Sequence, residues 1–552
     1  MNISSYLPRK GFLKTFAAVC ASSLALTAAH ATSVQRIGTV WYILIENRDF
    51  TENETSGGQQ IFGSPAAPYI NSLITPGNPN AAQVSFCTAY HNVLAVYNGT
   101  GPSIHPSEPN YVWFENGSNL SKLDDNDPYG SGASVNQIHN FLVANPAYTG
   151  QNLSGLLQAA GLTWRSYTEG TNQLNTVNTN ANLGGTLKAT PAPESIWTVP
   201  LASFSGTNVA YLNPYNGSDQ WNFACKHTGS LFFADTNGTA SLTVANTSTT
   251  NPEAAFYSPL PDLENDLLNN TCAQFNVITP DQYNDMHTAL TAGFTYHGVH
   301  YTGDSAQVAQ GDNFLSIVIP QIMASAAYQD NGMIVIWTDE TEGSNANDFN
   351  HTLTEIVISP LAKGNAYAST LNYTHSSDVN TLQKIFQVTA STFSGFLNDA
   401  ANPSNPTPAS LIGTNNQLGG APSGYGTGQA YDLSDLFVPG VIPATIPTVS
   451  ITPSGYVANR RSNTVTQVVT VTNLLNSPLT APVYLAVNSL SANTTLINAA
   501  GVTLNSLPAG SPYVVLSGSG LAAGASASVT LQFATPASGG ITDSLSVITT
   551  SP

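Results

Sequence analysis

The sequence predicts an α/β domain followed by a smaller β-rich domain, and three observations lead to this prediction. Between residue 32 and about residue 440, short apolar runs occur without polar alternation, which is typical of strands buried on both faces of a parallel sheet. Segments with helical spacing lie between these runs. After a Pro-rich segment at 441–447, the apolar runs are short and are separated by turn residues.

The first domain is expected to hold four core strands and at least two helices. The strands are predicted at 40–45, 275–278, 333–337 and 355–358. One helix is predicted from the spacing of Leu315, Val318, Ile319, Ile322 and Met323, with Asp312 as its N-cap and a kink at Pro320. A second helix is predicted at 378–387.

The second domain is predicted to be an immunoglobulin-like β-sandwich. Strand-like runs occur at 466–472, 483–487, 513–516, 527–533 and 544–548, a spacing typical of such sandwiches. Residues 448–552 contain no His and no Cys, so a stabilising or spacing module is favoured over a binding module. The role of this domain stays open.

The charge balance excludes one class of partner. The chain has 13 Lys and Arg against 32 Asp and Glu, a formal net charge of −19, whereas phosphate backbones and anionic membranes are bound through Lys and Arg. We therefore expect no nucleic-acid partner. Hydrophobic residues make up 41% of the chain, enough for a large core, and charged residues only 8%, so the surface is expected to consist of Asn, Ser, Thr and Gly.

The N-terminus reads as a signal peptide over residues 1–31. Three basic residues precede an apolar stretch at 15–28, and Ala29-His30-Ala31 is a small-x-small cleavage site. The alternative is a membrane anchor, but the stretch is short for a span of about 20 residues. We expect a secreted protein, extracellular or periplasmic and without a stable membrane anchor, whose catalytic domain covers 32–440.

The cysteines favour at most one disulfide. Removal of the signal leaves Cys87, Cys225 and Cys272, and an odd count leaves one thiol over. A Cys225–Cys272 pair is weakly preferred. No CxxC or Cys/His cluster is present, so a structural zinc site is not expected.

Polar residues follow three of the expected strands. Glu46-Asn47 comes directly after 40–45, Asp339-Glu340 comes shortly after 333–337, and Asn284-Asp285-Met286-His287 follows 275–278. In open α/β sheets ligands bind beyond the carboxyl ends of strands, so these groups should meet at one edge. Crowded carboxylates repel one another unless a cation lies between them, and oxygen ligands favour hard ions. The alternative is that each acid is a helix cap or a solvated loop residue.

Ser107 is a candidate nucleophile. It lies between two prolines in His105-Pro-Ser-Glu-Pro-Asn-Tyr111, where it could instead be a helix N-cap. A Ser hydroxyl is a weak nucleophile and needs a base or a metal to activate it. No Gly-x-Ser-x-Gly elbow surrounds Ser107, so a metal-activated Ser is the coherent alternative.

Six motifs in order give a specific resemblance. They are Ile45-Glu46-Asn47-Arg48-x-Phe50, His105-Pro-Ser-Glu-Pro-Asn-Tyr111, Ile278-Thr-Pro-x(4)-Asp285-x-His287, Gly311-Asp-x-Phe-Leu315, Trp337-Thr-Asp339-Glu340 and Tyr373-Thr-His375-Ser-Ser377. Together they resemble the phosphoesterase family of acid phosphatases and phospholipases C, within the alkaline-phosphatase-like superfamily. The resemblance covers residues from about 38 to 400 and does not extend to the C-terminal domain.

The resemblance implies a fold, a cofactor and a set of site residues. It implies an alkaline-phosphatase-like central, mostly parallel sheet flanked by helices. It implies one divalent metal, with Ca²⁺, Mg²⁺ or Mn²⁺ favoured by the oxygen ligands and Zn²⁺ as an alternative. The implied metal ligands are Glu46, Asn47, Ser107, Asp339 and Glu340; Ser107 is also the nucleophile, Asn110 binds the phosphate oxygens, His287 faces the phosphate or leaving group, and His375 lies in a family motif without an assigned role and is placed with the substrate-binding residues.

The chain also departs from the family pattern. His351 falls where many members have Asp-His, but here Asn350 precedes it. The segment 295–301 looks inserted, and His297 and His300 within it could form a metal pair, although a surface loop is the favoured interpretation.

The leading functional hypothesis is a secreted phosphatase that hydrolyses small phosphate monoesters through a phosphoseryl intermediate. A phospholipase C acting on diesters is the alternative within the enzymes, and it would need an apolar lip, for which Tyr111, Trp113 and Phe114 are candidates. The alternative from another class is a catalytically silent surface or adhesion protein.

Overall fold

The computed structural model describes most of the chain between residue 35 and its C-terminus. The described residues are 35–52, 60–92, 105–117, 125, 127–128, 152–169, 204–207, 212–237, 252–342, 351–390, 395–397, 432–443, 445–446, 448–475, 478–479, 481–504, 509–536, 538–549 and 552. The expected signal peptide at 1–31 lies outside them, as does part of the expected linker at 441–447.

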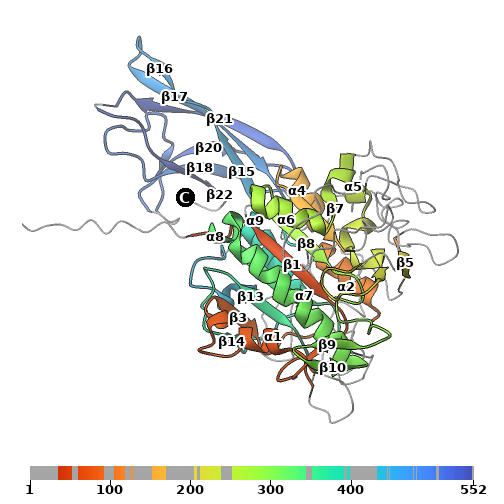
Figure 1. Ribbon diagram of the computed structural model, residues 1–552. Coiled ribbons are helices and arrows are strands. Elements are labelled where there is room, and N and C mark those ends of the chain that lie inside the picture. The colour runs from red at the N-terminus through yellow and green to blue at the C-terminus, as the bar shows by residue number, and fades with distance from the viewer. Residues whose placement is uncertain are drawn as a thin grey trace, which may run out of the picture. The chain divides into compact units, whose positions relative to one another are not determined.

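A central mixed sheet of eight strands organises the first domain (Figure 1). From one edge to the other, the strands are β14 (Tyr367–Ser369), β3 (Val84–Cys87), β13 (Glu355–Ile358), β11 (Met333–Thr338), β1 (Val40–Ile45), β8 (Phe275–Thr279), β4 (Trp164–Thr168) and β7 (Tyr257–Pro259).

The centre of the sheet is parallel, as the apolar runs predicted. β1 lies between β11 and β8 and pairs with both in parallel. All six residues of β1 and all six of β11 are buried, which explains why neither strand alternates. β13 is the exception, because it runs antiparallel to both β11 and β3.

Helices cover both faces of this sheet. Val40, Tyr42 and Leu44 of β1 pack into one core with α2 (Ser107–Asn116), α4 (Leu153–Ala159) and α9 (His375–Phe386). The alternate residues of β1 pack into the opposite core with α1 (Pro68–Leu73), α6 (Pro261–Asn269) and α7 (Asp304–Ala324). Figure 1 shows α7, in green, running alongside β1, in red. The shorter helices include α5 (Ala234–Asn237) and α8 (Ala326–Gln329).

Asp312 corrects one sequence expectation. It lies inside α7, which begins at Asp304 rather than at Asp312. Its two carboxylate oxygens accept hydrogen bonds from the backbone N–H groups of Tyr69 at 2.9 Å and Ile70 at 2.8 Å. Asp312 therefore caps the start of α1, a helix far away in the sequence. The second expected helix is present as α9 and begins at His375, ahead of the predicted start.

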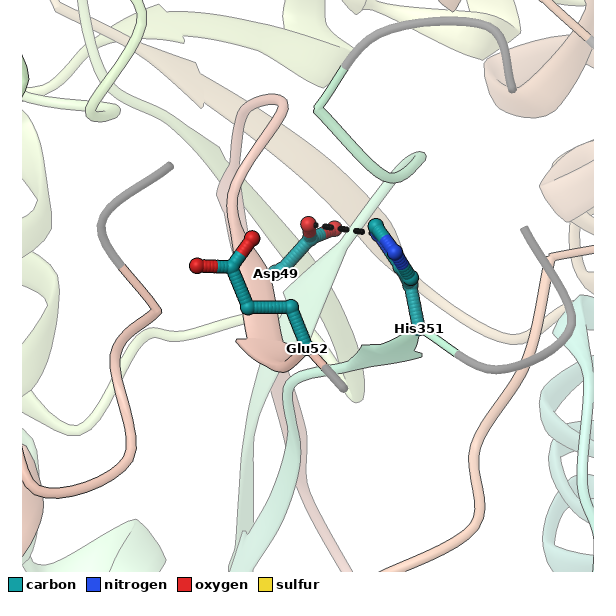
Figure 2. A group of neighbouring side chains, drawn as sticks. All are labelled: Asp49, Glu52 and His351. Atoms are coloured by element: carbon teal, nitrogen blue, oxygen red, sulfur yellow. Dashed lines mark hydrogen bonds and ion pairs between the residues drawn. The ribbon is translucent and has the colours of Figure 1, made fainter. Parts of the chain in front are cut away.

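Three small ribbons lie outside the main sheet. β2 (Asp49–Thr51) begins shortly after the end of β1 in the sequence and pairs with β12 (Thr352–Leu353). Figure 2 shows Asp49, Glu52 and His351 gathered at this pair. β9 (Phe294–Tyr296) pairs with β10 (Val299–Tyr301), and β5 (Phe204–Thr207) pairs with β6 (Gln220–Phe223). His297 and His300 belong to the β9–β10 hairpin, and the side chain of His300 is exposed.

The described residues between 449 and 548 form two four-stranded antiparallel sheets around a core of their own, and their separation as a domain stays a prediction. The strands are β15 (Val449–Pro453), β16 (Val457–Asn459), β17 (Thr464–Asn473) and β21 (Ser526–Ala534) in one sheet, with β18 (Val483–Asn488), β19 (Gly501–Val502), β20 (Pro512–Ser517) and β22 (Ser544–Ile548) in the other. The immunoglobulin-like topology of these strands stays a prediction.

The preferred Cys225–Cys272 disulfide is wrong. Both thiols are free, because Cys225 lies in the core on one face of the sheet and Cys272 packs against the core on the other face. Among the described residues, no helix combines the length and apolar character needed to cross a membrane.

Candidate active site

Backbone hydrogen bonds tie together the three segments that follow β1, β8 and β11. The N–H of Glu46 donates to the carbonyl of Asp285 at 2.7 Å, and the N–H of Asp339 donates to the carbonyl of Ile45 at 3.3 Å. Because β1 is flanked by two parallel neighbours, the polar residues after all three strands emerge at the same edge. The candidate site is built on this edge.

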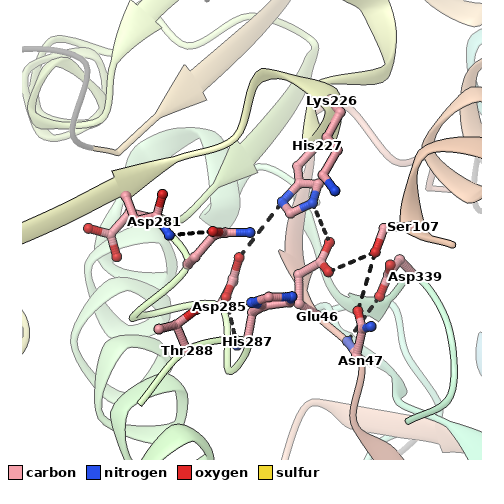
Figure 3. A network of polar contacts seen from close by, with 12 residues as sticks. Glu46, Asn47, Ser107, Lys226, His227, Asp281, Asp285, His287, Thr288 and Asp339 are labelled. Atoms are coloured by element: carbon pink, nitrogen blue, oxygen red, sulfur yellow. Dashed lines mark hydrogen bonds and ion pairs between the residues drawn. The ribbon is translucent and has the colours of Figure 1, made fainter. Parts of the chain in front are cut away.

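Ser107 faces the polar residues that follow β1 and β11. Its Oγ lies 3.0 Å from Glu340 Oε1, 3.1 Å from Glu46 Oε2 and 3.4 Å from Asn47 Oδ1. Figure 3 shows Glu46 between Ser107 on one side and His227 on the other. Ser107 is the first residue of α2, so its hydroxyl stands at the positive end of a ten-residue helix, where negative charge is stabilised.

Asn47 turns the chain sharply beyond β1. Its φ of 26° lies in a region that Asn tolerates better than most residues. The turn lets its backbone N–H donate to Asp339 Oδ1 at 3.1 Å and its side-chain amide donate to Glu340 Oε1 at 3.1 Å. Glu46, Asn47, Ser107, Asp339 and Glu340 thus form one contiguous polar cluster.

Burial makes this cluster electrostatically costly. Glu46 and Asp339 are fully buried. Burial, together with the nearby charge of Glu340, raises the pKa of Glu46 to about 8, although the Tyr111 hydroxyl opposes this shift. The pKa of Asp339 is also raised well above its usual range, first by burial and then by the charges of Glu46 and Glu340. Carboxyl groups placed in this way hold protons unless a cation joins them.

The side chain of Asn110 also faces the cluster. It is fully buried one helical turn after Ser107, and its amide donates to Glu340 Oε2 at 3.3 Å. An amide donor at this position can reach an acceptor that is attached to Ser107.

Three further residues contact the cluster, and the sequence predicted none of them as a catalytic residue or metal ligand. The hydroxyl of Tyr111 donates to Glu46 Oε1. His227 stacks on Tyr111, and its Nε2 lies 3.3 Å from Glu46 Oε1. His105 Nδ1 lies 2.6 Å from Glu340 Oε2. Tyr111 and His105 were in the Ser107 motif, whereas His227 comes from the short 3₁₀ helix η5 (Cys225–His227), where no strand end or periodicity indicates a site.

His287 lies at the rim of the network. Its side chain is exposed, and its backbone N–H donates to Asp285 Oδ1 at 2.8 Å. Partial desolvation and the positive charges of Lys226 and Arg48 lower the pKa of His287 below its usual value. Figure 3 shows its ring near Glu46 and Asp285.

His375 lies behind the cluster. Its Nε2 is 2.5 Å from the carbonyl oxygen of Asp339, and its Nδ1 is 2.9 Å from the Tyr90 hydroxyl. Burial lowers the pKa of His375 to about 3, so the ring is neutral. With both nitrogens engaged by protein groups, His375 is placed to position the segment of Asp339, and its role in substrate binding stays a prediction.

A second polar group lies on the β2–β12 ribbon. It consists of Asp49, Glu52 and His351, which could hold a metal ion because one ligand atom of each lies within 4.8 Å of the others. Burial raises the pKa of Asp49 to about 6, and the Glu52 charge adds to this shift while His351 opposes it. Neither Asp49 nor Glu52 was predicted to be a site residue, and Asn350 lies outside the described residues.

Several solved structures are similar to this chain at low sequence identity. A protein in the alkaline phosphatase superfamily from Vibrio parahaemolyticus is 11% identical, with 79% of this chain and 77% of that chain covered and a TM-score of 0.33. The lipoteichoic acid synthase LtaP from Listeria monocytogenes is 10% identical, with 69% of this chain and 77% of that chain covered and a TM-score of 0.30. The PsFucS1 sulfatase from Pseudoalteromonas sp. is 10% identical, with 80% of this chain and 78% of that chain covered and a TM-score of 0.35. These TM-scores are too low to establish a common fold.

A family model, unlike these structures, establishes the family of the chain. No curated protein matches the chain. The Phosphoesterase family model matches residues 77–389, which is more than half of the chain and includes Ser107, Asn110, His287, Asp339 and Glu340. Glu46 and Asn47 precede the matched region. The chain belongs to the Phosphoesterase family.

Proposed function

We propose that this protein is a metal-dependent phosphatase of the acid phosphatase type, which hydrolyses small phosphate monoesters through a phosphoseryl intermediate on Ser107. Family membership supports a phosphate-ester hydrolase in general. The observation that carries the finer proposal is the position of Ser107 Oγ, within 3.4 Å of Glu46, Asn47 and Glu340. The proposal includes export of the protein through the signal peptide expected at residues 1–31.

The residues of the cluster fit a divalent cation. Asp339 Oδ2 is buried and has no hydrogen-bond partner among the described residues, and the carboxyl groups of Glu46 and Glu340 lie in the same cluster. Glu46, Asn47, Ser107, Asp339 and Glu340 would hold the ion, and their oxygen atoms favour Ca²⁺, Mg²⁺ or Mn²⁺, with Zn²⁺ as the alternative. Such an ion, when bound, polarises the phosphoryl group and favours ionisation of a nearby hydroxyl.

The protein's own residues supply nucleophile, proton acceptor and orientation. A bond forms between Ser107 Oγ and phosphorus while the ester bond to the leaving alcohol breaks, and the Ser107 proton passes to the carboxylate of Glu46 or Glu340. The start of α2 and the Asn110 amide stabilise the phosphoryl oxygens. His287 in its protonated form donates a proton to the leaving oxygen. Water then attacks the phosphoserine and gives a proton to His287, while the proton held by Glu46 or Glu340 returns to Ser107 Oγ as its bond to phosphorus breaks. This step releases phosphate and restores Ser107.

The aromatic residues near the site favour monoesters over phospholipids. Tyr111, Trp113 and Phe114 were the candidates for an apolar lip, but they are 1%, 0% and 3% exposed. Tyr111 and Phe114 pack into the core on one face of the sheet, and none of the three buried side chains can present a surface to a lipid. The silent-protein alternative is weakened because every expected ligand is retained and all five lie in one cluster.

Replacement of Ser107 by Ala tests the proposal directly. We expect hydrolysis of p-nitrophenyl phosphate to fall by about 10³-fold or more, because the nucleophile is lost. Ser434→Ala, at an exposed serine of η9 (Leu433–Leu436), is the matched control and should retain full activity. Assays against p-nitrophenylphosphorylcholine, with and without a chelator, separate the phosphatase from the phospholipase C. Activity of Ser107→Ala within a few fold of the parent would remove Ser107 from the nucleophile role.

A further inference from the structure

Asp49, Glu52 and His351 form a second cluster of metal-ligating side chains (Figure 2). Asp49 opens β2, Glu52 follows its last residue, and His351 comes directly before β12. A carboxylate oxygen of each acid and a ring nitrogen of the histidine lie within 4.8 Å of one another. Asp49 and His351 are buried and Glu52 is half-buried, so the cluster opens to solvent on the side of Glu52.

The state of His351 points to a missing ligand. Its side chain is only 6% exposed, and its Nδ1 lies 2.9 Å from Asp49 Oδ2. Its Nε2 is buried and has no hydrogen-bond partner within the part of the chain that the structure describes. Nδ1 and Asp49 Oδ2 are close enough to ligate the same ion, which would replace the proton that these two atoms share.

The charges near the cluster also favour a cation. Asp49 and Glu52 bring two carboxylates to one side of the ribbon. Arg48 is next in sequence, but its guanidinium is directed to other acids, with Nη1 2.6 Å from Glu342 and Nη2 3.7 Å from Asp304. Its Nε donates to the carbonyl of Met286 at 3.2 Å. These contacts of the Arg48 guanidinium are therefore with groups outside the cluster.

We propose that Asp49, Glu52 and His351 bind a second divalent cation of the borderline transition type, for which Zn²⁺ is the model ion. One imidazole nitrogen with two carboxylate oxygens suits Zn²⁺ better than Mg²⁺ or Ca²⁺, which prefer oxygen ligands alone. Three protein ligands leave a coordination position for water.

This site shares no ligand with the cluster around Ser107, but it touches the same two segments. Asp49 comes two residues after Asn47, and the N–H of Glu342, two residues after Glu340, donates to Asp49 Oδ1 at 3.1 Å. A cation here would join β2 to the residue before β12. It would thereby fix the segments that carry Asn47 and Glu340.

Counting bound metal in matched variants tests the second site. The full-length protein is stripped with a chelator and titrated with Zn²⁺ by calorimetry, and bound metal is counted by mass spectrometry after dialysis. We expect two equivalents in the parent and one in His351→Gln. His300→Gln removes an exposed histidine of β10 and should leave both equivalents.

The first site is separated from the second by Asp339→Asn. This variant should lose the other equivalent and keep the one held by His351. If His351→Gln loses one equivalent while Asp339→Asn loses none, the second site stands and the metal cluster at Ser107 fails. Unchanged stoichiometry and affinity in His351→Gln overturns the second site, whatever Asp339→Asn does.

Cobalt supplies a readout that a merely structural role would not change. Co²⁺ bound by nitrogen and oxygen ligands shows visible absorption bands that report its coordination, so His351→Gln should remove one set of bands. If this variant fails to fold, Glu52→Gln at the half-buried edge replaces it, with folding checked by circular dichroism. Bands identical to those of the parent in a folded Glu52→Gln or His351→Gln protein contradict the proposal.

Discussion

Ser107 begins a helix but does not cap it. The N-cap position belongs to Pro106, and the Ser107 hydroxyl points to Glu46 and Glu340 instead of to a backbone N–H. The side chain of a capping serine accepts a hydrogen bond from one of the first free N–H groups of its helix. No side-chain hydrogen bond of this kind caps α2. The geometry therefore weakens the structural interpretation of Ser107 that the sequence left open, and it leaves the hydroxyl available for chemistry.

His287 gives a prediction for pH. Its pKa is lowered below its usual value, so its protonated form, the proposed acid, is lost as pH rises through a value below about 6.5. In His287→Asn we expect turnover of an alkyl phosphate, whose leaving group needs a proton, to fall by about 100-fold or more. The basic limb of the pH profile for kcat should flatten at the same time.

Substrate choice provides the control for this prediction. p-Nitrophenolate leaves without a proton, so p-nitrophenyl phosphate should be much less sensitive to His287→Asn than the alkyl phosphate. Equal losses for both substrates with an unchanged pH profile would mean that His287 binds phosphate without donating a proton.

At the scale of the elements, the cap of α1 depends on a residue of another helix. Asp312 of α7 is fully buried, and its carboxylate accepts hydrogen bonds from the backbone N–H groups of Tyr69 and Ile70 in the first turn of α1. Asp312→Ala leaves these donors without an acceptor and should lower the free energy of unfolding by about 1–2 kcal/mol.

Thermal and urea unfolding measure the effect of Asp312→Ala. Asp330→Ala, at an exposed aspartate after α8, controls for the loss of one carboxylate from the surface and should change stability little. If both variants unfold at the same urea concentration as the parent, the Asp312 contacts to α1 carry no net stability.

The same elements show which parts of the fold the sequence could predict. Unbroken apolar runs located β1, β8 and β11 because burial on both faces removes any alternation. The same signal located β13 but not its antiparallel direction, since burial carries no information about direction. Asp312 was assigned to the wrong helix because a capping pattern records the residue type and not its partner.

Some residues of the candidate site could likewise be predicted from the sequence, and others could not. Glu46, Asn47, Asp339 and Glu340 could be found because they follow buried strands, and Ser107 because of its motif. His227 reaches Glu46 from a segment 181 positions away, and only the folded chain shows this contact. Asp49 and His351 are likewise brought together by the pairing of β2 with β12, which no local pattern predicted.

At the scale of the whole molecule, buried acids outside the candidate site share the behaviour of Glu46. Burial raises the pKa of each of three further carboxyl groups to about 7; these are Glu115, Glu169 and Asp312. Each group gains a proton more readily in the folded chain than in the unfolded chain, where the usual carboxyl pKa is near 4. The folded protein therefore holds protons that unfolding releases.

Linkage turns this into a prediction about stability. Because the folded pKa values lie above the unfolded ones, the stabilisation is fully present below about pH 4 and is lost as pH rises through about 7–8. For these groups together we expect the free energy of unfolding to fall by several kcal/mol between about pH 5 and about pH 8 in the presence of a chelator. The melting temperature should fall over the same range. A flat or rising melting temperature would contradict the raised pKa values.

Two controls separate the buried acids from the net charge of −19. Repulsion among surface carboxylates also grows with pH, but salt screens it, whereas buried groups are screened much less. The fall in melting temperature should therefore persist in high salt. Divalent metal should restore part of the lost stability at alkaline pH, because a cation binds the ionised forms of Glu46 and Asp339 and makes their burial favourable. Ca²⁺, which prefers oxygen ligands and so does not suit the site at His351, should have this effect on the parent and little effect on Asp339→Asn. The Ca²⁺-dependent part of the pH profile would then identify the carboxyl groups of the candidate site.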